Sequence, residues 1–385
     1  MKRIALLVTL LAAGLVGCSD DDTNDNNNNT PQEFSAVTFN GGLARGFVPL
    51  ADARAQIIAD AVAELDVDVI CLQEIWQPEH VDMVQAAAAD TFPNQIFLEP
   101  MPDLNPGDPA CSPDATEVQA METCARDNCG TALPDDLVDC VLGHCLLQFT
   151  SLTPECQSCI AANVSGTIDD TFNACAVSSE AYAYGGAFGI GLLTNETVTT
   201  SDSSVFASTF NRRAVIHAEL ETEALGTVHV FCTHLTAVFS SIPWPKPEGS
   251  WEAEQLAQVV AIRDYVDTMA GADGVVILMG DFNSGPDGNG YVADVEDNYN
   301  ALVEGYTSVY PEEPDATCTF CDLNPLNGGI DHDESVLIDH ILLRSFTGTY
   351  DADRILTEPI TITVDGTPIE TAYSDHYGVQ VTMHP

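Results

Sequence analysis

The hydrophobic and polar positions of this chain follow two different periods. Residues 34–40 read FSAVTFN, in which apolar and polar side chains alternate as they do in a strand with one buried face. Residues 51–65 instead repeat apolar side chains at helical spacing, and residues 68–73 (DVICLQ) form a short apolar run of buried-strand length. The start of the domain therefore predicts a strand, a helix and a second strand.

The same two patterns continue outside a cysteine-rich stretch. Helices are predicted over 80–89 and 250–269, and the apolar stripe of the second consists of Leu256, Val259, Val260, Ile262 and Val266. Strands are predicted over 188–194, 205–210, 214–220, 228–232, 275–279, 336–343, 360–364 and 378–383. Many strands with a few long helices indicate a layered α/β or α+β domain.

The N-terminal residues have the pattern of an export signal. Met1-Lys2-Arg3 is followed by an apolar run of 13 residues (4–16), too short to cross a membrane as a permanent helix. Leu15-Val16-Gly17-Cys18 resembles a bacterial lipobox, which implies a signal peptide of residues 1–17 and a lipid attached to Cys18. The alternative is an ordinary signal peptide cleaved nearby. Both predict export, and the first predicts a lipoprotein anchored to the bacterial cell envelope.

Amino-acid composition distinguishes an N-terminal tether from the folded domain that follows it. Residues 19–32 read SDDDTNDNNNNTPQ and contain no apolar side chain, so residues 18–32 are predicted to be a disordered acidic tether. The remaining residues, 33–385, are enough for one large domain, and an apolar content of 45% supports a sizeable core.

The charge balance restricts the partners. The chain has 59 Asp and Glu against 11 Lys and Arg, a formal charge of −48, and its lysines are Lys2 and Lys246. Nonspecific nucleic-acid binding needs a positive surface, which argues against a DNA-coating role. An enzyme with a metal-neutralised cleft remains compatible, and acidity that only keeps an exported monomer soluble is an equal alternative.

Cysteines concentrate in one segment. Apart from Cys18, 12 of the 13 cysteines remain, and eight lie within residues 101–180, several of them 16 residues apart. In an exported chain this predicts a disulfide-rich, helical insert, although eight cysteines allow 105 pairings. Zinc is the alternative, because Cys156-x-x-Cys159 and Cys318-x-x-Cys321 have ligand spacing. We expect Cys318 and Cys321 to clip a loop, and Cys71 and Cys232 to be buried thiols or one bridge between strands.

Polar residues follow the predicted strands. Asn or Asp at a strand end is an ordinary turn residue, and one such site is weak evidence. Here six strand ends each carry an oxygen ligand or an imidazole, as expected when an active site is assembled from distant segments. These ends hold Asn40, Gln73-Glu74, Thr233-His234, Gly280-Asp281-Phe282-Asn283, Ile338-Asp339-His340 and Ser374-Asp375-His376.

This set of residues suits metal-assisted hydrolysis. Carboxylate and amide oxygens favour Mg²⁺, Mn²⁺ or Ca²⁺ over a soft metal. Such an ion neutralises the charge of a phosphate ester, and a histidine with a pKa near neutrality moves protons.

In order and spacing, the six motifs resemble the endonuclease/exonuclease/phosphatase superfamily, which includes deoxyribonuclease I and the neutral sphingomyelinases. The resemblance covers about residues 34–385 except the insert, and it implies a four-layer α/β/β/α sandwich with the site at one edge of two packed sheets.

The resemblance also implies roles. The metal ligands would be Glu74 and Asn40, with Asp375 on the metal side. His376 would activate water, and Asp339 would hold its imidazole. The remaining roles would fall to Asp281 and Asn283, which orient nucleophile and phosphate, and to His234, which contacts phosphate or protonates the leaving oxygen. Arg213 is a further candidate, with a surface ion pair as the favoured alternative.

The substrate remains open at this stage. The anchor, the acidity and Gln73-Glu74-Ile75-Trp76, which is similar to the corresponding motif of neutral sphingomyelinases, favour a phosphodiesterase acting on a phospholipid or sphingomyelin headgroup. The loop 239–249 either inserts Phe239 and Trp244 into a bilayer or packs its own aromatics, and the second is slightly favoured. Residues 347–373 carry only Tyr350 and Tyr373 as aromatics, which argues against a membrane-disrupting toxin.

Two alternative functions remain. One is an exported deoxyribonuclease I-like endonuclease, which lacks the usual basic groove. The other is a noncatalytic lipoprotein that binds an unidentified protein through its insert. The intact polar set argues against the second.

Overall fold

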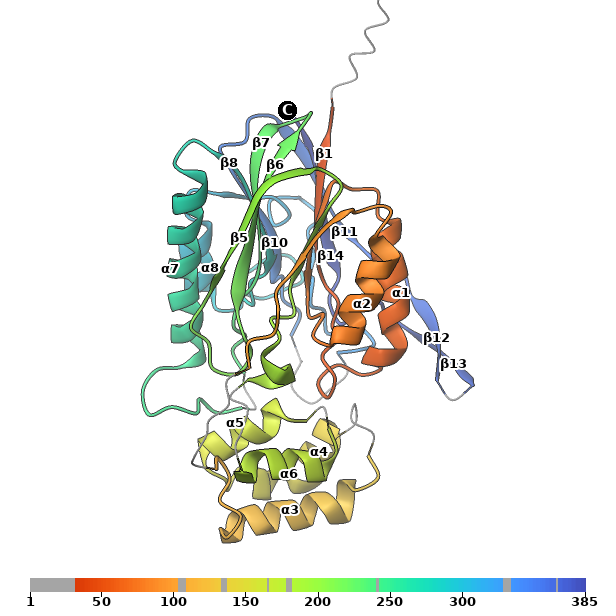
Figure 1. The fold of residues 1–385 in the computed structure, drawn as a ribbon, viewed down its shortest axis with the longest axis vertical. Helices are drawn as coiled ribbons and strands as arrows, with labels where there is room; N and C mark the ends of the chain where they lie inside the picture. Colours follow the sequence, from red (N-terminus) through yellow and green to blue (C-terminus); the bar gives the residue numbers. More distant parts are fainter. Residues whose placement is uncertain are drawn as a thin grey trace, which may run out of the picture. The chain divides into compact units, whose positions relative to one another are not determined.

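The computed structural model describes residues 32–102, 109–132, 137–164, 166–177, 182–239, 242–327, 334–364 and 366–385 (Figure 1). Residues Gln32–Pro385 form one compact unit. The predicted signal peptide, Cys18 and the tether up to Pro31 lie outside the described residues, so they remain predictions.

The first of the two main sheets brings together segments from both ends of the domain. Its six strands have the order β11-β14-β1-β2-β4-β3. The central pair, β1 and β2, is parallel, and Asn40 lies opposite Gln73 where both strands end. The strands are β1 (Phe34–Asn40), β2 (Val69–Gln73), β3 (Asn94–Phe97), β4 (Gly191–Thr194), β11 (Thr349–Ile355) and β14 (Gly378–His384).

The second sheet repeats this arrangement around another parallel pair. Its order is β5-β6-β7-β8-β10-β9, with β7 parallel to β8 and β10 antiparallel to β8. Asp281 at the end of β8 consequently lies between His234 and Asp339. The strands are β5 (Thr197–Val205), β6 (Ala214–Thr222), β7 (Gly226–His234), β8 (Val275–Asp281), β9 (Thr307–Ser308) and β10 (Asp339–Arg344).

Three apolar layers hold the sandwich together. The largest lies between the sheets and includes Val69, Leu192, Ile277 and Val381. The outer face of the first sheet packs on α1 (Ala51–Glu64) and α2 (Pro78–Ala88). The outer face of the second packs on α7 (Trp251–Ala270) and α8 (Glu296–Val303). The predicted four-layer α/β/β/α sandwich is confirmed (Figure 1).

Helix α7 also positions loops of the site end. Ser250 caps it by accepting a hydrogen bond from Ala253 N. The predicted apolar stripe is too wide, because Leu256 and Val260 are exposed. The buried face instead includes Gln255, whose amide donates to Thr236 O and Asn283 O, each at 2.8 Å. A polar side chain is retained there because its hydrogen bonds fix two backbone segments.

One strand prediction is wrong. Residues 206–210 are not a strand, and β5 lies before them at Thr197–Val205. Most side chains of β5 are exposed, so its sequence TVTTSDSSV shows little of the period of a buried strand. Backbone pairing with β6 holds it in the sheet. A separate hairpin, β12 (Ile360–Val364) with β13 (Thr367–Thr371), forms a two-stranded sheet of its own.

The insert lies between β3 and a 3₁₀ turn, η2 (Ala183–Gly186). Its helices are α3 (Thr116–Cys129), α4 (Leu137–Phe149), α5 (Pro154–Ala162) and α6 (Ile168–Val177). Met101 N donates to Gly186 O at 2.9 Å, so the two ends of the insert meet. The four helices lie beyond the end of the sandwich at which β1 terminates (Figure 1).

Disulfides join the twelve cysteines of the described residues. Four pairs lie in the insert: Cys111–Cys156, Cys124–Cys145, Cys129–Cys140 and Cys159–Cys175. Cys71–Cys232 joins β2 to β7, and Cys318–Cys321 closes a loop. The zinc alternative is therefore wrong for these cysteines. Six disulfides are typical of proteins that fold outside the cytosol.

The described part of the chain contains no helix both long and apolar enough to span a membrane.

Candidate active site

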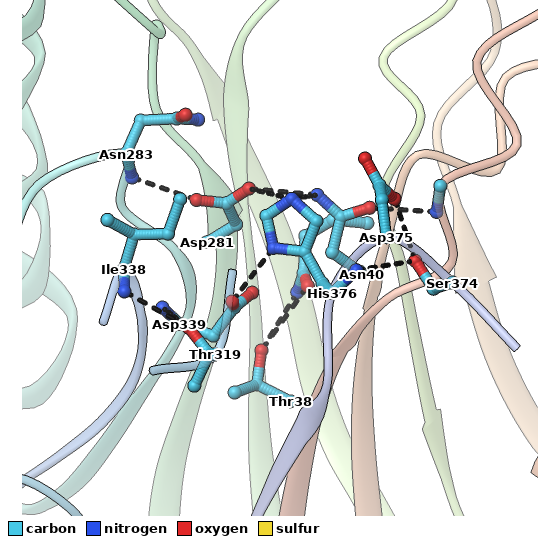
Figure 2. Close-up of polar contacts among 12 residues, drawn as sticks. Thr38, Asn40, Asp281, Asn283, Thr319, Ile338, Asp339, Ser374, Asp375 and His376 are labelled. Atoms are coloured by element: carbon cyan, nitrogen blue, oxygen red, sulfur yellow. Dashed lines mark hydrogen bonds and ion pairs between the residues drawn. The ribbon is translucent and has the colours of Figure 1, made fainter. Parts of the chain in front are cut away.

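Strand ends from both sheets meet at one edge of the sandwich. In the first sheet β1 and β2 end in Asn40 and Gln73, and β14 begins just after His376. In the second, β7 and β8 end in His234 and Asp281. Figure 2 shows Asn40 of β1, Asp281 of β8 and His376, which precedes β14, pointing toward one another. The structure thus brings together residues that lie up to 336 positions apart in the sequence.

His376 and Asp339 form a hydrogen-bonded pair. Nδ1 of His376 lies 2.9 Å from Asp339 Oδ2, and both side chains are buried. Nε2 of His376 lies 3.9 Å from Asp281 Oδ2 and 3.5 Å from Asn40 Nδ2. One ring nitrogen is therefore held by a carboxylate and the other faces the centre of the site, the arrangement of a histidine oriented for proton transfer.

Asp281 connects the two halves of the site. Its Oδ2 accepts a hydrogen bond from Asn40 Nδ2 at 2.8 Å and lies 3.4 Å from His234 Nε2. Its Oδ1 accepts from the backbone N–H of Asn283 at 2.8 Å. Asn283 has a positive φ of 47°, and its amide lies 3.0 Å from His234 Nε2. Asp281, Asn283 and His234 therefore form one hydrogen-bonded unit.

Glu74 and Asp375 lie on the other side of Asn40. Ser374 Oγ donates to Asp375 Oδ1 at 2.9 Å, and Asn40 Oδ1 accepts from Gly42 N at 2.9 Å. A Cβ at Gly42 would lie 2.1 Å from Asp375 Oδ1, so only glycine lets this loop approach the carboxylate. Glu74 has a φ of 59°, a left-handed conformation that is uncommon outside glycine and often occurs at functional sites.

Crowded carboxylates perturb the acids of the site. Burial, followed by the charge of Asp375, raises the pKa of Glu74. Burial, followed by the charge of Asp339, raises the pKa of Asp281. Both shifts have the physical origin expected for like charges that share a desolvated space.

The two histidines shift in opposite directions. Burial lowers the pKa of His234 well below its ordinary value, and the cation of Arg213 adds to this effect. Burial also opposes a charge on His376, but carboxylates led by Asp339 outweigh it and raise the pKa of His376 well above its ordinary value. His234 is consequently neutral, while His376 holds a proton in the absence of other cations.

Arg213 belongs to the site, which corrects the preference for a surface ion pair. It is 3% exposed and lies 5.8 Å from the ring of Trp76. Its Nε and Nη1 atoms have no hydrogen-bond partner within the described residues. Burial lowers the pKa of Arg213 to about 10, while Glu74 favours its charged form. A buried guanidinium with free donors is suited to bind an anionic group of a substrate.

Several residues that support the site could not be predicted from the sequence. Thr319 Oγ1 accepts from the backbone N–H groups of Ile338 and Asp339, each at 3.1 Å, and so fixes the start of β10. Asn324 and Asn327 donate to the carbonyls of Ser374 and Asp375. Thr319 lies inside the short loop that the Cys318–Cys321 disulfide closes, and Asn324 and Asn327 follow this loop in the chain.

The aromatic loop after β7 packs on itself. Trp251 lies within 5.1 Å of the ring of Phe239 and within 4.9 Å of the ring of Trp244. Trp244 Nε1 also donates to Glu248 O at 2.8 Å. Phe239 and Trp244 thus pack on Trp251 at the start of α7, which favours the interpretation that the loop packs its own aromatics.

A cavity of about 1070 Å³ opens over these residues. Its polar end is formed by Glu74, Arg213, His234, Asp281, Asn283, Asp375 and His376. Most of its other walls are apolar and include side chains of the insert. Among the described residues that line it, Arg213 is the one lysine or arginine.

The donor set fits a hard divalent cation. Oxygen and nitrogen atoms of Asp281, Asp339 and His376 lie within 4.8 Å of one another. Asp339 Oδ1 is buried without a hydrogen-bond partner among the described residues. The predicted acidic ligands Glu74 and Asp375 are not members of this cluster, although the charge of Glu74 interacts with those of Asp375, His376 and Asp281. A cation of the Mg²⁺ type would stabilise the carboxylates whose charges raise the pKa values of Glu74 and Asp281.

The fold and the polar edge define a class of enzymes that cleave phosphoric esters. Residues 38–376 match the Endonuclease/Exonuclease/phosphatase family, and the chain belongs to it. The matched range contains all eight residues predicted to be catalytic or metal-binding, from Asn40 to His376. No curated protein matches the chain.

Solved structures with the same fold have various activities. Sphingomyelinase C from Streptomyces griseocarneus is 16% identical, with a TM-score of 0.55 over 92% of this chain and 100% of that one. Beta toxin from Staphylococcus aureus, solved with bound magnesium ions, is 13% identical, with a TM-score of 0.55 over 91% and 99%. D. rerio TDP2, complexed with a single-strand DNA product, is 16% identical, with a TM-score of 0.52 over 92% and 99%. At these identities the likeness establishes the fold alone.

Proposed function

We propose that this protein is a divalent-cation-dependent phosphodiesterase that hydrolyses the headgroup ester of a phospholipid or sphingomyelin. The observation that carries the proposal is one cavity with two kinds of wall. The His376–Asp339 pair, Asp281 and Arg213 form its polar end, and apolar side chains form most of the rest. A lipid phosphodiester matches both walls, because its phosphate is anionic and its chain is apolar.

In the proposed reaction, water adds to phosphorus and the bond between phosphorus and the lipid alcohol oxygen breaks. His376 takes the proton of the attacking water at Nε2, because Asp339 holds Nδ1. Asp281 and Asn283 orient the water and the phosphate. The proton returns to the leaving oxygen, so the products are a lipid alcohol and a headgroup phosphate.

Arg213 and His234 would contact the phosphate. The guanidinium has unused donors, and the neutral imidazole of His234 is a hydrogen-bonding group. Because both are buried, little side-chain or solvent rearrangement accompanies the reaction.

Glu74, Asn40 and Asp375 would hold the cation, with Mg²⁺ as the first choice and Mn²⁺ or Ca²⁺ as alternatives. The cation, when bound, neutralises phosphate charge. It also offsets the carboxylate charges that favour a proton on His376.

Charge favours lipid over DNA. A DNA groove binds many phosphates through lysines and arginines, but the described lining of this cavity offers Arg213 alone. The fold resembles that of Sphingomyelinase C and that of D. rerio TDP2 to a similar extent, so fold likeness does not decide between the two substrates.

The test offers sphingomyelin liposomes, phosphatidylcholine liposomes and plasmid DNA to the unit Gln32–Pro385, with Mg²⁺ or with EDTA. We expect cation-dependent release of phosphocholine and intact plasmid. Glu74→Gln should abolish the release, whereas Glu79→Gln, on the exposed start of α2, should not.

Nicked plasmid beside intact lipid would replace this proposal with a nuclease. Turnover of neither substrate, together with no Mg²⁺ binding by calorimetry, would support an inert scaffold that binds a protein partner.

We further propose that the protein works as a monomer held at the cell envelope by lipid on Cys18. The support is the lipobox-like Leu15-Val16-Gly17-Cys18 and a disulfide set that uses the other twelve cysteines. Mass spectrometry of the mature N-terminus should find a diacylglycerol-modified Cys18, and Cys18→Ala should move the protein from the membrane fraction to the soluble fraction. An unmodified N-terminus would identify an ordinary signal peptide.

A further inference from the structure

The cavity does not end at the catalytic edge. It continues into the insert, where every one of the four helices contributes apolar side chains to its wall. Beyond the polar end, the lining from the insert consists mainly of Met121, Val141, Leu142, Phe149, Ile160 and Phe172. The polar and apolar parts therefore belong to one continuous space.

This space is large for a protein interior. Packed interiors contain few voids larger than a water molecule, and ligand pockets usually measure about 300–1000 Å³. At about 1070 Å³ the cavity reaches the upper end of that range.

The insert can tolerate an open interior because its disulfides hold the helices. Its buried cluster contains only twelve residues, and five of these are cysteines. Cross-links stabilise the fold by restricting the unfolded chain, so they reduce the need for a fully packed core.

Water is a poor occupant of the insert end. An ordered water needs two to four polar partners, and an apolar wall without them gains more from contact with hydrocarbon than with water. Thr171 is the polar residue that the insert adds to the described lining, and its hydroxyl is already bonded to Asn163 O at 2.9 Å and Thr167 O at 3.1 Å.

Apolar contacts keep the insert against the sandwich. Ala161 and Ala162 at the end of α5 pack with Phe210, Ile242 and Trp251. Val164 approaches so closely that a Cβ at Gly46 would lie 2.7 Å from its side chain. The apolar chamber is therefore held beside the catalytic edge.

We infer that the insert is an acyl-chain chamber: it takes one hydrocarbon chain of the lipid whose phosphoester lies at the polar end of the cavity. The identity of that phosphoester rests on the proposed function. The chamber itself needs only an apolar chain joined to an anionic headgroup, which makes it testable without turnover.

The test uses Val141→Trp and Leu142→Trp, which place a large ring in the chamber, and Leu147→Trp as a matched control on the same helix. Leu147 is 81% exposed and does not line the cavity. The probe is a lysophosphatidylcholine with a fluorescent acyl chain, added below its micellar concentration in EDTA so that hydrolysis is blocked. We expect at least a tenfold weaker binding by the two chamber variants and unchanged binding by the control.

Turnover provides a second measurement. With Mg²⁺, the chamber variants should lose at least tenfold in kcat/KM toward a long-chain lipid while retaining the rate on a soluble phosphocholine ester that has no acyl chain. Circular dichroism and the melting temperature check that each variant folds, and Leu142→Ala replaces a variant that does not. Shortening this side chain should change chain-length preference.

The outcomes separate the two proposals. Probe binding without any phosphoester turnover would overturn the proposed function and keep the chamber. Turnover of long-chain lipid that Val141→Trp and Leu142→Trp leave unchanged, together with unchanged probe binding, would keep the function and overturn the chamber.

Discussion

Two six-stranded sheets hold the catalytic edge, whereas four disulfides hold the helices of the insert. The layer between the sheets is built from many Val, Ile, Leu and Phe side chains that pair across long sequence distances. The cluster of the insert is small and rich in cysteine. The sandwich is thus stabilised mainly by burial of apolar surface and the insert mainly by cross-links. The comparison shows two ways to build one site. A packed sandwich holds the catalytic groups rigidly, and a cross-linked insert leaves room for an apolar ligand.

The largest effect should come from His376, on the rigid side of this comparison. His376→Ala removes the group that moves the proton, so kcat should fall by about 10²- to 10⁴-fold with little change in KM or in melting temperature. His384→Ala is the matched control, because this second histidine of the same region forms surface ion pairs with Glu33 and Asp351. A His376→Ala enzyme with the normal rate would remove this histidine from the reaction.

Next in size is the loss of a cross-link in the insert. Cys124→Ala with Cys145→Ala opens a loop with a sequence separation of 21, which should destabilise the insert by about 3 kcal/mol. Because the insert has little core to replace the bond, limited proteolysis should cut α3 or α4 while the sandwich stays intact.

The matched variant removes Cys71–Cys232 from the sandwich. It should lower the melting temperature of the whole domain without exposing the insert to protease. Equal protease sensitivity of both variants would contradict a division of stability between core and cross-links.

A smaller effect on activity is expected at Arg213. Arg213→Met removes the buried guanidinium, and the loss of charged hydrogen bonds worth about 1.5–3 kcal/mol corresponds to roughly 10- to 150-fold in kcat/KM. Arg212→Met is the control, because the Arg212 guanidinium lies over the ring of Tyr182 and donates to Met101 O. Steady-state kinetics on one phosphodiester decides between a substrate-binding and a purely structural Arg213.

The smallest effect concerns acid sensitivity of the sandwich. His217 stacks on Phe231 and lies 3.1 Å from His229, and burial lowers the pKa of His217 to about 4. Its neutral form is therefore favoured in the folded protein. The free energy of unfolding keeps its full value above pH 6.5. It falls by about 1 to 2 kcal/mol as the pH decreases from 6.5 toward 4, because the unfolded chain then binds a proton that the folded protein does not.

His217→Phe should reduce this loss, as measured by urea unfolding at pH 7 and pH 4.5, and His384→Phe should not. If His217→Phe shows the same loss as the wild type, the acid sensitivity lies elsewhere.

Much of the catalytic edge could be predicted because the end of a strand can be recognised from the local sequence. A polar residue directly after an apolar run, as at Asn40 and Asp281, is visible without knowing which strands pair. The pattern of strands and helices predicted a layered α/β or α+β domain, and the family resemblance implied its four layers. Roles of individual site residues stay predictions until turnover is measured.

What escaped prediction depends on partners distant in sequence. Arg213 looked like one surface charge among acidic residues, and only the fold buries it beside Trp76 and Glu74. The strand β5 has few buried side chains and so lacks a hydrophobic period. The disulfide pairing of the insert follows from the packing of its helices, because the 16-residue repeat corresponds to one bond alone, Cys159–Cys175.

The Cys71–Cys232 bond lies two residues before Gln73 and His234, the last residues of β2 and β7, with its Cα atoms 5.3 Å apart. It therefore sets the spacing of the sheets almost at the point where their ends supply the catalytic groups. A change in the volume of the layer between the sheets therefore also changes the alignment of the catalytic groups. A substitution at Ile277 or Met279 that thickens the layer between the sheets would move Asp281 relative to Asn40. Attempts to make the enzyme more heat-resistant by repacking that layer should be scored on turnover as well as on melting temperature.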